Sequence, residues 1–395
     1  MRRPSDFNTA LFVVGGVVTA QTILGFSLPL LAFELSGAGT GLALIKGAGF
    51  VPNILFAVLI GVVNDRMLKA TAFRRYTAGL AAATALLLAA ALTDRLSLPG
   101  LVLFVVVLNG LAYAAGNAQM TLIRLAVPEE RLSDATALTS TVHAVITTAG
   151  PAVAGLMLLH LGHAGVIAAC AALLALTALG ALRLDPEEAL EPPRPFLPSL
   201  AEGWRVLRAN RELCAMTVVI VLTNAAEGAY GTALILKLKT EAGANAFEIG
   251  LVLAAAGVGA VLASLRAADI RRRLGYRTAF FWPIWGLAAL YLAVILDWPI
   301  WALCVLSFLE GGLSLFFAIG VWSYRQESTE ARHMGRVAGL TGAIFKIGMP
   351  PVILLAGVLS DADQLAAVLI LAAGINACAA LFLAYPARWG WPRRA

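Results

Sequence analysis

The stretch Gly61-Val62-Val63-Asn64-Asp65-Arg66 is a short polar interruption between two long apolar segments, and basic residues follow it at Lys69, Arg74 and Arg75. The same arrangement recurs along the chain: of its 395 residues, 60% are hydrophobic and only 13% are charged. A soluble domain carries roughly 25% charged residues. Most of the apolar surface must therefore face lipid, which predicts an all-α polytopic membrane protein.

Apolar segments long enough to cross a bilayer occur throughout the sequence. A membrane-spanning helix needs about 20 predominantly apolar residues. By this measure we expect twelve such helices, at residues 8–33, 41–63, 76–93, 100–123, 135–159, 163–182, 213–236, 247–265, 278–296, 299–323, 337–359 and 364–385.

The basic residues indicate which side of the membrane each loop occupies. With the N-terminus inside, three of the 29 Lys and Arg residues lie outside (Arg95, Lys237 and Lys239), two lie within spans (Lys46 and Lys346), and the other 24 are cytoplasmic. This asymmetry follows the positive-inside rule and predicts that both termini are cytoplasmic. The net charge of +6 thus reflects topology and contact with anionic lipids, not nucleic-acid binding. We expect a monomer in the bacterial cytoplasmic (inner) membrane.

The longest polar stretch divides the chain into two halves. We expect an N-terminal six-helix bundle at residues 1–183, a cytoplasmic linker at 184–212 and a C-terminal six-helix bundle at 213–395. Within the linker, residues 199–211 predict an amphipathic helix, with Trp204 and Leu207 on its apolar face. The halves match weakly at an offset of about 200 residues, so that Leu108-Asn109-Gly110 aligns with Leu309-Glu310-Gly311. Such repeats predict a pseudo-symmetric transporter with a substrate site near the bilayer midplane.

The polar interruption also resembles the signature loop of the major facilitator superfamily. That loop reads Gly, three residues, Asp-Arg and then basic residues, and here it corresponds to Gly61, Asp65 and Arg66. The resemblance implies the major facilitator fold of twelve helices in two bundles. It also implies a gating role for these three residues, as a cytoplasmic latch that breaks when the halves rock.

Further stretches resemble the macrolide-efflux and enterobactin-exporter branch of that superfamily. They are Ser27-Leu28-Pro29, Val127-Pro128-Glu129-Glu130-Arg131-Leu132, Gly150-Pro151 leading to Gly155, and Gly335-Arg336-Val337. Gly150-Pro151 resembles a helix 5 motif of antiporters, because proline bends a helix and glycine permits close packing. A generic helix kink also explains this pair, so its gating role is an expectation of the resemblance.

Two carboxylates fall near the middle of predicted spans. Glu227 and Glu310 would lie at mid-depth, and an ionisable group there is costly enough to suggest function. In the other half, Glu227 aligns within a residue with Gln21 and Glu310 with Asn109, so the carboxylates are confined to the C-terminal half. We interpret Glu227 and Glu310 as proton-coupling groups. An ion pair with Lys346 that merely holds helices together is the alternative.

The other polar side chains within the spans are candidate substrate contacts. Lys46 either attracts an anionic substrate or extends to the outer headgroups. His143 either relays protons or packs between helices. The remaining candidates are Lys346, Asn109, Asn224 and Gln21, and amides in such positions also bridge helices.

These features together favour a proton-coupled antiporter that exports a small organic molecule: a drug, a secondary metabolite or a siderophore. A proton symporter that imports a metal chelate or nutrient is the alternative. An intramembrane enzyme has less support, because the sequence has no His-Glu-x-x-His, Gly-x-Ser-x-Gly or phosphate-binding loop. Neither a cofactor nor a metal is expected, since the four cysteines lie in apolar segments without paired spacing.

Overall fold

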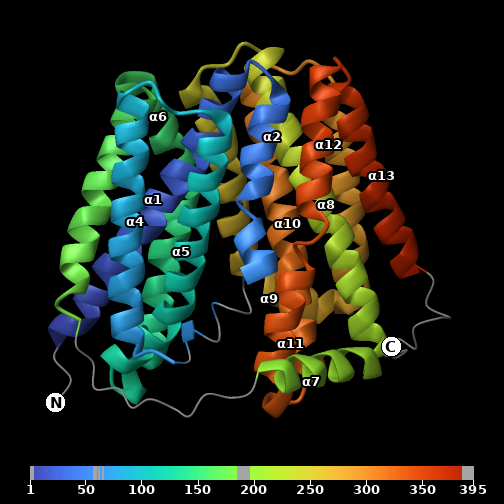
Figure 1. Cartoon of the computed structure of the whole chain (residues 1–395). Coiled ribbons are helices and arrows are strands. Elements are labelled where there is room, and N and C mark those ends of the chain that lie inside the picture. Colours follow the sequence, from blue (N-terminus) through green and yellow to red (C-terminus); the bar gives the residue numbers. More distant parts are fainter. Residues whose placement is uncertain (1–3, 57–59, 61–62, 65, 185–195, 385–395) are drawn as a thin grey trace. The chain divides into compact units, whose positions relative to one another are not determined.

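The computed structural model describes residues 4–56, 60, 63–64, 66–184 and 196–384, and in these ranges every regular element is a helix (Figure 1). The elements are α1 (Pro4–Ser36), α2 (Gly39–Ala48), the π-helix η1 (Pro52–Phe56), α4 (Lys69–Leu92), α5 (Leu98–Ala126), the 3₁₀-helix η2 (Glu129–Arg131), α6 (Leu132–Ala181), α7 (Phe196–Ala209), α8 (Arg211–Thr240), α9 (Ala246–Ala293), α10 (Ile300–Ser328), α11 (Ala331–Ile344), α12 (Met349–Asp361) and α13 (Leu365–Ala384).

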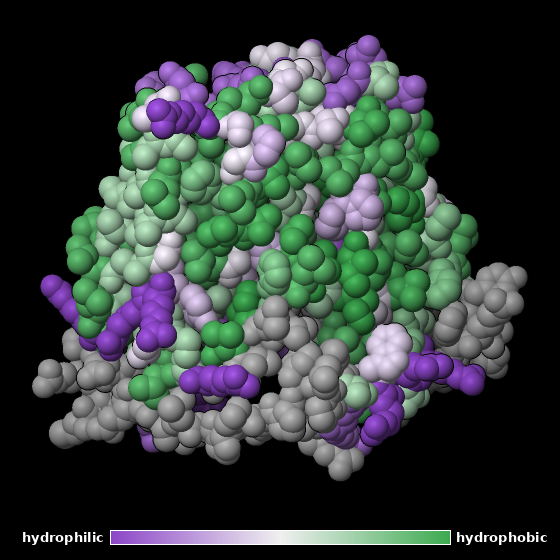
Figure 2. Space-filling model, viewed as in Figure 1, coloured by the Kyte–Doolittle hydropathy of each residue, from purple (hydrophilic) through white to green (hydrophobic). Residues whose placement is uncertain are grey.

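Within the described residues, ten helices are long and apolar enough to cross a membrane. One of them, α6, has 50 residues and turns at Gly162, where φ is 64°. Similarly, α9 turns at Gly275, where φ is 72°, and continues into the shorter apolar helix Ala279–Ala293. Glycine adopts positive φ at little cost, so both residues permit a reversal of direction that other residues would resist. In Figure 2, hydrophobic residues cover the middle of the helices and hydrophilic ones gather near their ends.

The helices pack into two compact units. The first comprises residues 1–194 and 245–254, and in it α1 packs along α6 while α4 packs on α5 and α6. The second comprises residues 195–244 and 255–395, and in it α8 packs against α12 and α13. Within this second unit α9 and α10 approach at backbone distance, because Gly311 faces the carbonyl of Ala256 and Gly259 faces that of Phe308.

Two of the predicted spans are interrupted instead of continuous. In the span predicted at 41–63, α2 ends at Ala48 and the π-helix begins at Pro52. In the span predicted at 337–359, residues 345–348 form a turn between α11 and α12, and prolines follow directly at Pro350 and Pro351. Proline lacks an N–H and fits the first turn of a helix, so each proline favours a new helix start over continuation of the old one.

The amphipathic segment of the linker forms helix α7, which lies across the ends of α8 and α11 in the second unit (Figure 1). Leu207 is buried in a hydrophobic cluster together with residues of α8. The Oε1 of Glu202 lies 3.2 Å from the Nε2 of His333 on α11. Trp204 is half exposed, although we expected it on the same apolar face as Leu207.

Candidate functional site

The two carboxylates of the C-terminal half lie in one electrostatic environment. Glu310 is the eleventh residue of α10 and is only 7% exposed, whereas Glu227 is on α8 and is exposed. The charge that acts on the Glu310 carboxyl group is that of Glu227. The structure thus brings together the two residues that we interpreted as proton-coupling groups.

Two stacked tyrosines lie beside these carboxylates, and the sequence analysis missed them. Tyr230 of α8 and Tyr291 of α9 have ring centroids 4.1 Å apart and planes within 12° of parallel. Both phenol groups interact electrostatically with Glu310, and Tyr291 also interacts with Glu227. The helical spacing of Tyr230, three residues after Glu227, places the two on one helix face and could have identified it.

Ser307 and Asn376 complete this polar cluster. Ser307 is three residues before Glu310 on α10 and neighbours Tyr230, whereas Asn376 comes from α13 and neighbours Tyr291. Neither contact has the geometry of a normal hydrogen bond. Within the described part of the chain, the Tyr230 Oη, the Ser307 Oγ and both amide atoms of Asn376 are buried without a hydrogen-bond partner. We call these six residues, from Glu227 to Asn376, the carboxylate–tyrosine cluster.

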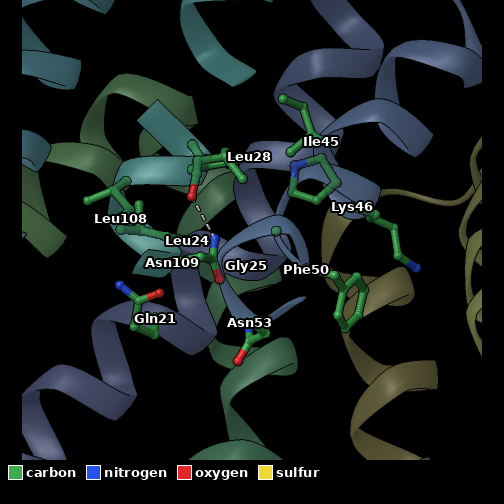
Figure 3. A pocket seen from close by; sticks show the side chains of 13 residues that line it. Gln21, Leu24, Gly25, Leu28, Ile45, Lys46, Phe50, Asn53, Leu108 and Asn109 are labelled. Atoms are coloured by element: carbon green, nitrogen blue, oxygen red, sulfur yellow. Dashed lines mark hydrogen bonds between the residues drawn. The ribbon is translucent and has the colours of Figure 1, made fainter. Parts of the chain in front are cut away.

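A second polar site, in the first unit, is a pocket of about 270 Å³ between α1, α2 and α5. Gln21, Asn53 and Asn109 line it with three amide groups, and Lys46 and Phe50 lie at its edge (Figure 3). The Nδ2 of Asn109 donates to the carbonyl of Val105 at 2.9 Å, which leaves its oxygen for other groups. The Nε2 of Gln21 is buried with no hydrogen-bond partner among the described residues.

Figure 3 also shows how the predicted substrate contacts of this half divide. The amides of Gln21, Asn53 and Asn109 gather on one side, and the Lys46 side chain points away from them. Asn53 was not predicted; it lies in η1, directly after the interruption, and lines the same pocket as Asn109. The pocket can therefore hydrogen-bond a polar group of a ligand, with a cation available at the edge.

The interruption between α11 and α12 contains Lys346, which we expected on a continuous helix. Lys346 is half-buried in the turn of residues 345–348. The adjacent carbonyl of Phe345 accepts a 2.9 Å hydrogen bond from the Nδ2 of Asn224 on α8. Asn224 thus satisfies a carbonyl group that the break leaves without its helical partner, so its observed contact bridges helices.

We predict that Asn224→Leu destabilises the protein by about 1 kcal/mol, since a carbonyl group inside an apolar region loses its donor. The midpoint of thermal unfolding in detergent measures this effect. Thr217→Val is the matched control, because the Thr217 hydroxyl donates within its own helix, to the carbonyl of Leu213 at 2.7 Å. Equal unfolding midpoints for Asn224→Leu and wild type would contradict the bridging role.

The remaining predicted residues are spread over the first unit. His143 is exposed on α6, so it lies outside the pocket. Gly150 faces Thr22 of α1, which fills the space a side chain would need, and the carbonyl of Pro151 faces Gly250 of the same unit. Arg66 is exposed. Gly61 and Asp65 lie outside the described residues.

Asn64, in the same signature loop, is the residue that anchors it. The Asn64 side chain is buried, donates to the carbonyl of Ala114 at 3.2 Å and accepts from Tyr76 Oη at 2.6 Å. Its own carbonyl accepts from the Lys69 ammonium group at 2.5 Å. The loop is therefore fastened to both α4 and α5.

Solved structures share this fold at low sequence identity. The nucleoside transporter NupG has a TM-score of 0.72 and 16% identity, over 96% of this chain and 99% of that chain. The POT family transporter PepTSo has a TM-score of 0.75 and 12% identity, over 98% and 99%. The E. coli fucose:proton symporter FucP has a TM-score of 0.63 and 14% identity, over 98% and 99%.

The sequence itself also matches a family model. No curated protein matches the chain. Residues 26–390, which are most of the sequence, match the family described as transmembrane secretion effector. With its membrane-spanning helices and its transporter fold, the protein is a multi-pass transporter and not an enzyme. The chain belongs to the transmembrane secretion effector family of major facilitator transporters.

Proposed function

We propose that the protein is a proton-coupled antiporter that exports a small organic molecule, as expected of the macrolide-efflux and enterobactin-exporter branch. The observation that carries this proposal is the carboxylate–tyrosine cluster, in which Glu310 is buried in an apolar helix beside a second carboxylate. A buried carboxylate takes up and releases protons in response to neighbouring charge. Substrate binding can therefore be linked to the protonation of Glu310.

The topology that accompanies this function has twelve membrane crossings in two six-helix bundles, at 1–183 and 213–395, joined by the linker at 184–212. The length of α6 supports this count, because 50 residues suffice for two crossings of about 20 residues each. Both termini are then cytoplasmic and the protein resides in the bacterial inner membrane. The amide pocket at Gln21, Asn53 and Asn109 is the proposed contact for the substrate.

Export, in preference to import, is supported by the description of the family as secretion effectors. A similar fold also occurs in a fucose:proton symporter, so the fold itself is compatible with both directions. Import of a nutrient or metal chelate by symport is therefore the alternative function, and an experiment must distinguish it from export by antiport.

The decisive experiment measures proton flux in inverted membrane vesicles that contain the protein. An inside-acid gradient is imposed and followed with a pH-sensitive dye while drugs, metabolites and siderophores are added one at a time. For an antiporter, we expect a compound to dissipate the gradient as it enters the vesicle against protons that leave. Vesicles without the protein are the control. Proton flux that runs with the substrate would indicate symport, and no flux with any compound would refute proton coupling.

The charge of the substrate is tested at Lys46. For an anionic compound, we predict that Lys46→Met raises the half-saturating concentration about tenfold, equivalent to ~1.4 kcal/mol, because a cation at the pocket edge is lost. Lys46→Arg retains the charge and should bind nearly as wild type. Transport assays with an anionic and a neutral compound separate the effects. Equal losses for both compounds would show that Lys46 acts on packing and not on charge.

A further inference from the structure

A histidine at the turn of α6 links that turn to α1 in the first unit. His163 follows Gly162 directly, and the positive φ of Gly162 turns the chain there. The Nδ1 of His163 lies 3.1 Å from the Oγ of Ser27, and its Nε2 lies 3.1 Å from the Oε2 of Glu34. Ser27 and Glu34 are seven residues apart on α1, so they share one face of that helix. The imidazole ring therefore contacts two side chains of the same helix.

Serine, histidine and an acid in contact resemble a hydrolase triad, but the geometry excludes that chemistry. In such a triad the serine Oγ lies at Nε2 of the histidine and is open to a substrate carbonyl group. Here Ser27 lies at Nδ1 and is 0% exposed, so no substrate reaches its hydroxyl group. The side chains of His163 and Glu34 are 15% and 50% exposed. A proton from the surrounding water can thus reach the ring, while the serine is shielded.

The arrangement suits both protonation states of the ring. When His163 is neutral with its hydrogen on Nε2, the Ser27 hydroxyl can donate to Nδ1. When the ring is protonated, Nδ1 becomes a donor and the hydroxyl becomes its acceptor, since a hydroxyl group serves in either role. Protonation also places a positive charge beside the Glu34 carboxylate, and such charge-assisted contacts are stronger than neutral ones. The ring can therefore take up a proton without a change in its neighbours.

We propose that His163 is a proton-binding site that ties the turn of α6 to α1 in mildly acidic solution and loosens this contact in alkaline solution. The ligand is the proton, which the ring nitrogen binds and the Glu34 carboxylate stabilises. The proposal does not require proton-coupled transport. On the proposed topology this end of the unit faces the outside, so the site responds to the pH there.

The elements that pack against α6 determine which other charges surround the site. They are α1, α4 and α5. The charged and titratable groups that these elements and α6 bring to this end of the unit (Figure 1) are Glu34 on α1, His160 on α6, and Asp94 and Arg95 just after α4. The helix α5 begins at this end, and its one charged residue, Arg124, is in its last turn.

The sign of the pH dependence follows from the charge of the partner. A free histidine is half protonated near about pH 6.5, and a neighbouring carboxylate favours the protonated ring. Glutamate carboxyl groups titrate near about pH 4.3, well below this range. The contact therefore stabilises the folded protein in mildly acidic solution, and the stabilisation is lost as the pH rises through neutrality.

The experiment measures the unfolding midpoint of the full-length purified protein in detergent at about pH 6 and about pH 8, on either side of the histidine range. Other groups titrate here too, so the informative quantity is the part of the gain at pH 6 that a variant removes. We expect His163→Asn and Glu34→Gln each to remove about 1–2 °C of this gain. The double variant should remove no more than either one, because both substitutions break the same contact.

His160→Asn is the matched control, because His160 is exposed on the same helix, three residues before His163. This control should retain the gain at pH 6. Glu34→Gln keeps the shape of a half-exposed side chain, so it leaves the protein folded and keeps the test valid where His163→Asn disrupts the turn. Hydrogen exchange of peptides that span the turn, corrected for the intrinsic effect of pH, supplies a local measurement. We expect it to be about fivefold slower at pH 6 in wild type than in Glu34→Gln.

The outcomes separate this inference from the proposed function. Equal losses of the gain in His163→Asn and His160→Asn would overturn His163 as the proton site. A full gain in Glu34→Gln would show that the ring takes up its proton without α1, and would overturn the tie between the helices. Proton flux in vesicles is a separate measurement: its absence would refute antiport and leave this site intact, whereas loss of the site would leave antiport intact.

Discussion

Glu310→Gln is expected to reduce proton-driven transport by roughly two orders of magnitude, the effect of losing a group that carries a transferred proton. Glutamine has the same shape and can still hydrogen-bond, but it cannot bind and release a proton near neutral pH. Glu310 is only 7% exposed and lies near Glu227 and two tyrosines, so bulk water has little access with which to replace its carboxyl group. Proton flux in inverted vesicles measures the loss.

A second assay distinguishes a coupling defect from a folding defect. Exchange of labelled for unlabelled substrate across the membrane requires no net proton movement, so Glu310→Gln should retain it. Glu248→Gln makes the same substitution at the start of α9, where the side chain accepts from the backbone N–H of Asn245 at 2.8 Å. Glutamine can replace glutamate in such a cap, so this control should transport normally. Proton-driven transport at the wild-type rate in Glu310→Gln would exclude Glu310 as the coupling group.

Gly311→Ala is expected to destabilise the protein by about 1–3 kcal/mol, the cost of forcing an atom into a packed interior. A Cβ at this position would overlap the backbone of Ala256 in α9, and a backbone carbonyl cannot rotate aside as a side chain can. The helices α9 and α10 would have to separate. Since Glu310 precedes Gly311 directly, that separation would also displace the carboxylate from Tyr291.

The matched control for this prediction is Gly374→Ala on α13. A Cβ there meets no atom within 4 Å, so the same substitution adds helix propensity without a clash. We expect Gly374→Ala to be as stable as wild type or more stable, by up to about 1 kcal/mol. Thermal unfolding in detergent compares the two variants. If both unfold at the wild-type temperature, the close approach of α9 and α10 does not contribute to stability.

Hydropathy and helical spacing predicted where apolar helices lie, but not where they are interrupted. Length and composition suffice for α1, α5, α8 and α10, because each is one continuous and predominantly apolar helix. The breaks near Phe50 and Lys346 fall inside runs of the same hydropathy, so only glycine and proline marked them. Hydrophobic periodicity alone does not predict a break at a glycine or proline whose neighbours are apolar.

In the carboxylate–tyrosine cluster, only the two charged members were predicted from the sequence. Glu227 and Glu310 are conspicuous because acids are rare at mid-depth in apolar helices. Tyr291, Ser307 and Asn376 are ordinary residues in a membrane helix, and they become significant only because packing of α9, α10 and α13 places them near Glu310. That contact depends on tertiary structure, which neither spacing nor composition encodes.

The interruptions have an electrostatic consequence for the two lysines that lie within spans. Lys46 is in the last turn of α2, and Lys346 follows the end of α11 by two residues. The carbonyl groups at the C-terminus of a helix carry roughly half a negative charge in aggregate. The carbonyl groups left without helical partners at each interruption therefore provide a backbone dipole of favourable sign close to a lysine. An interrupted helix thus offers a cation within an apolar segment stabilisation from the main chain, and each half of the chain carries a lysine at such a point.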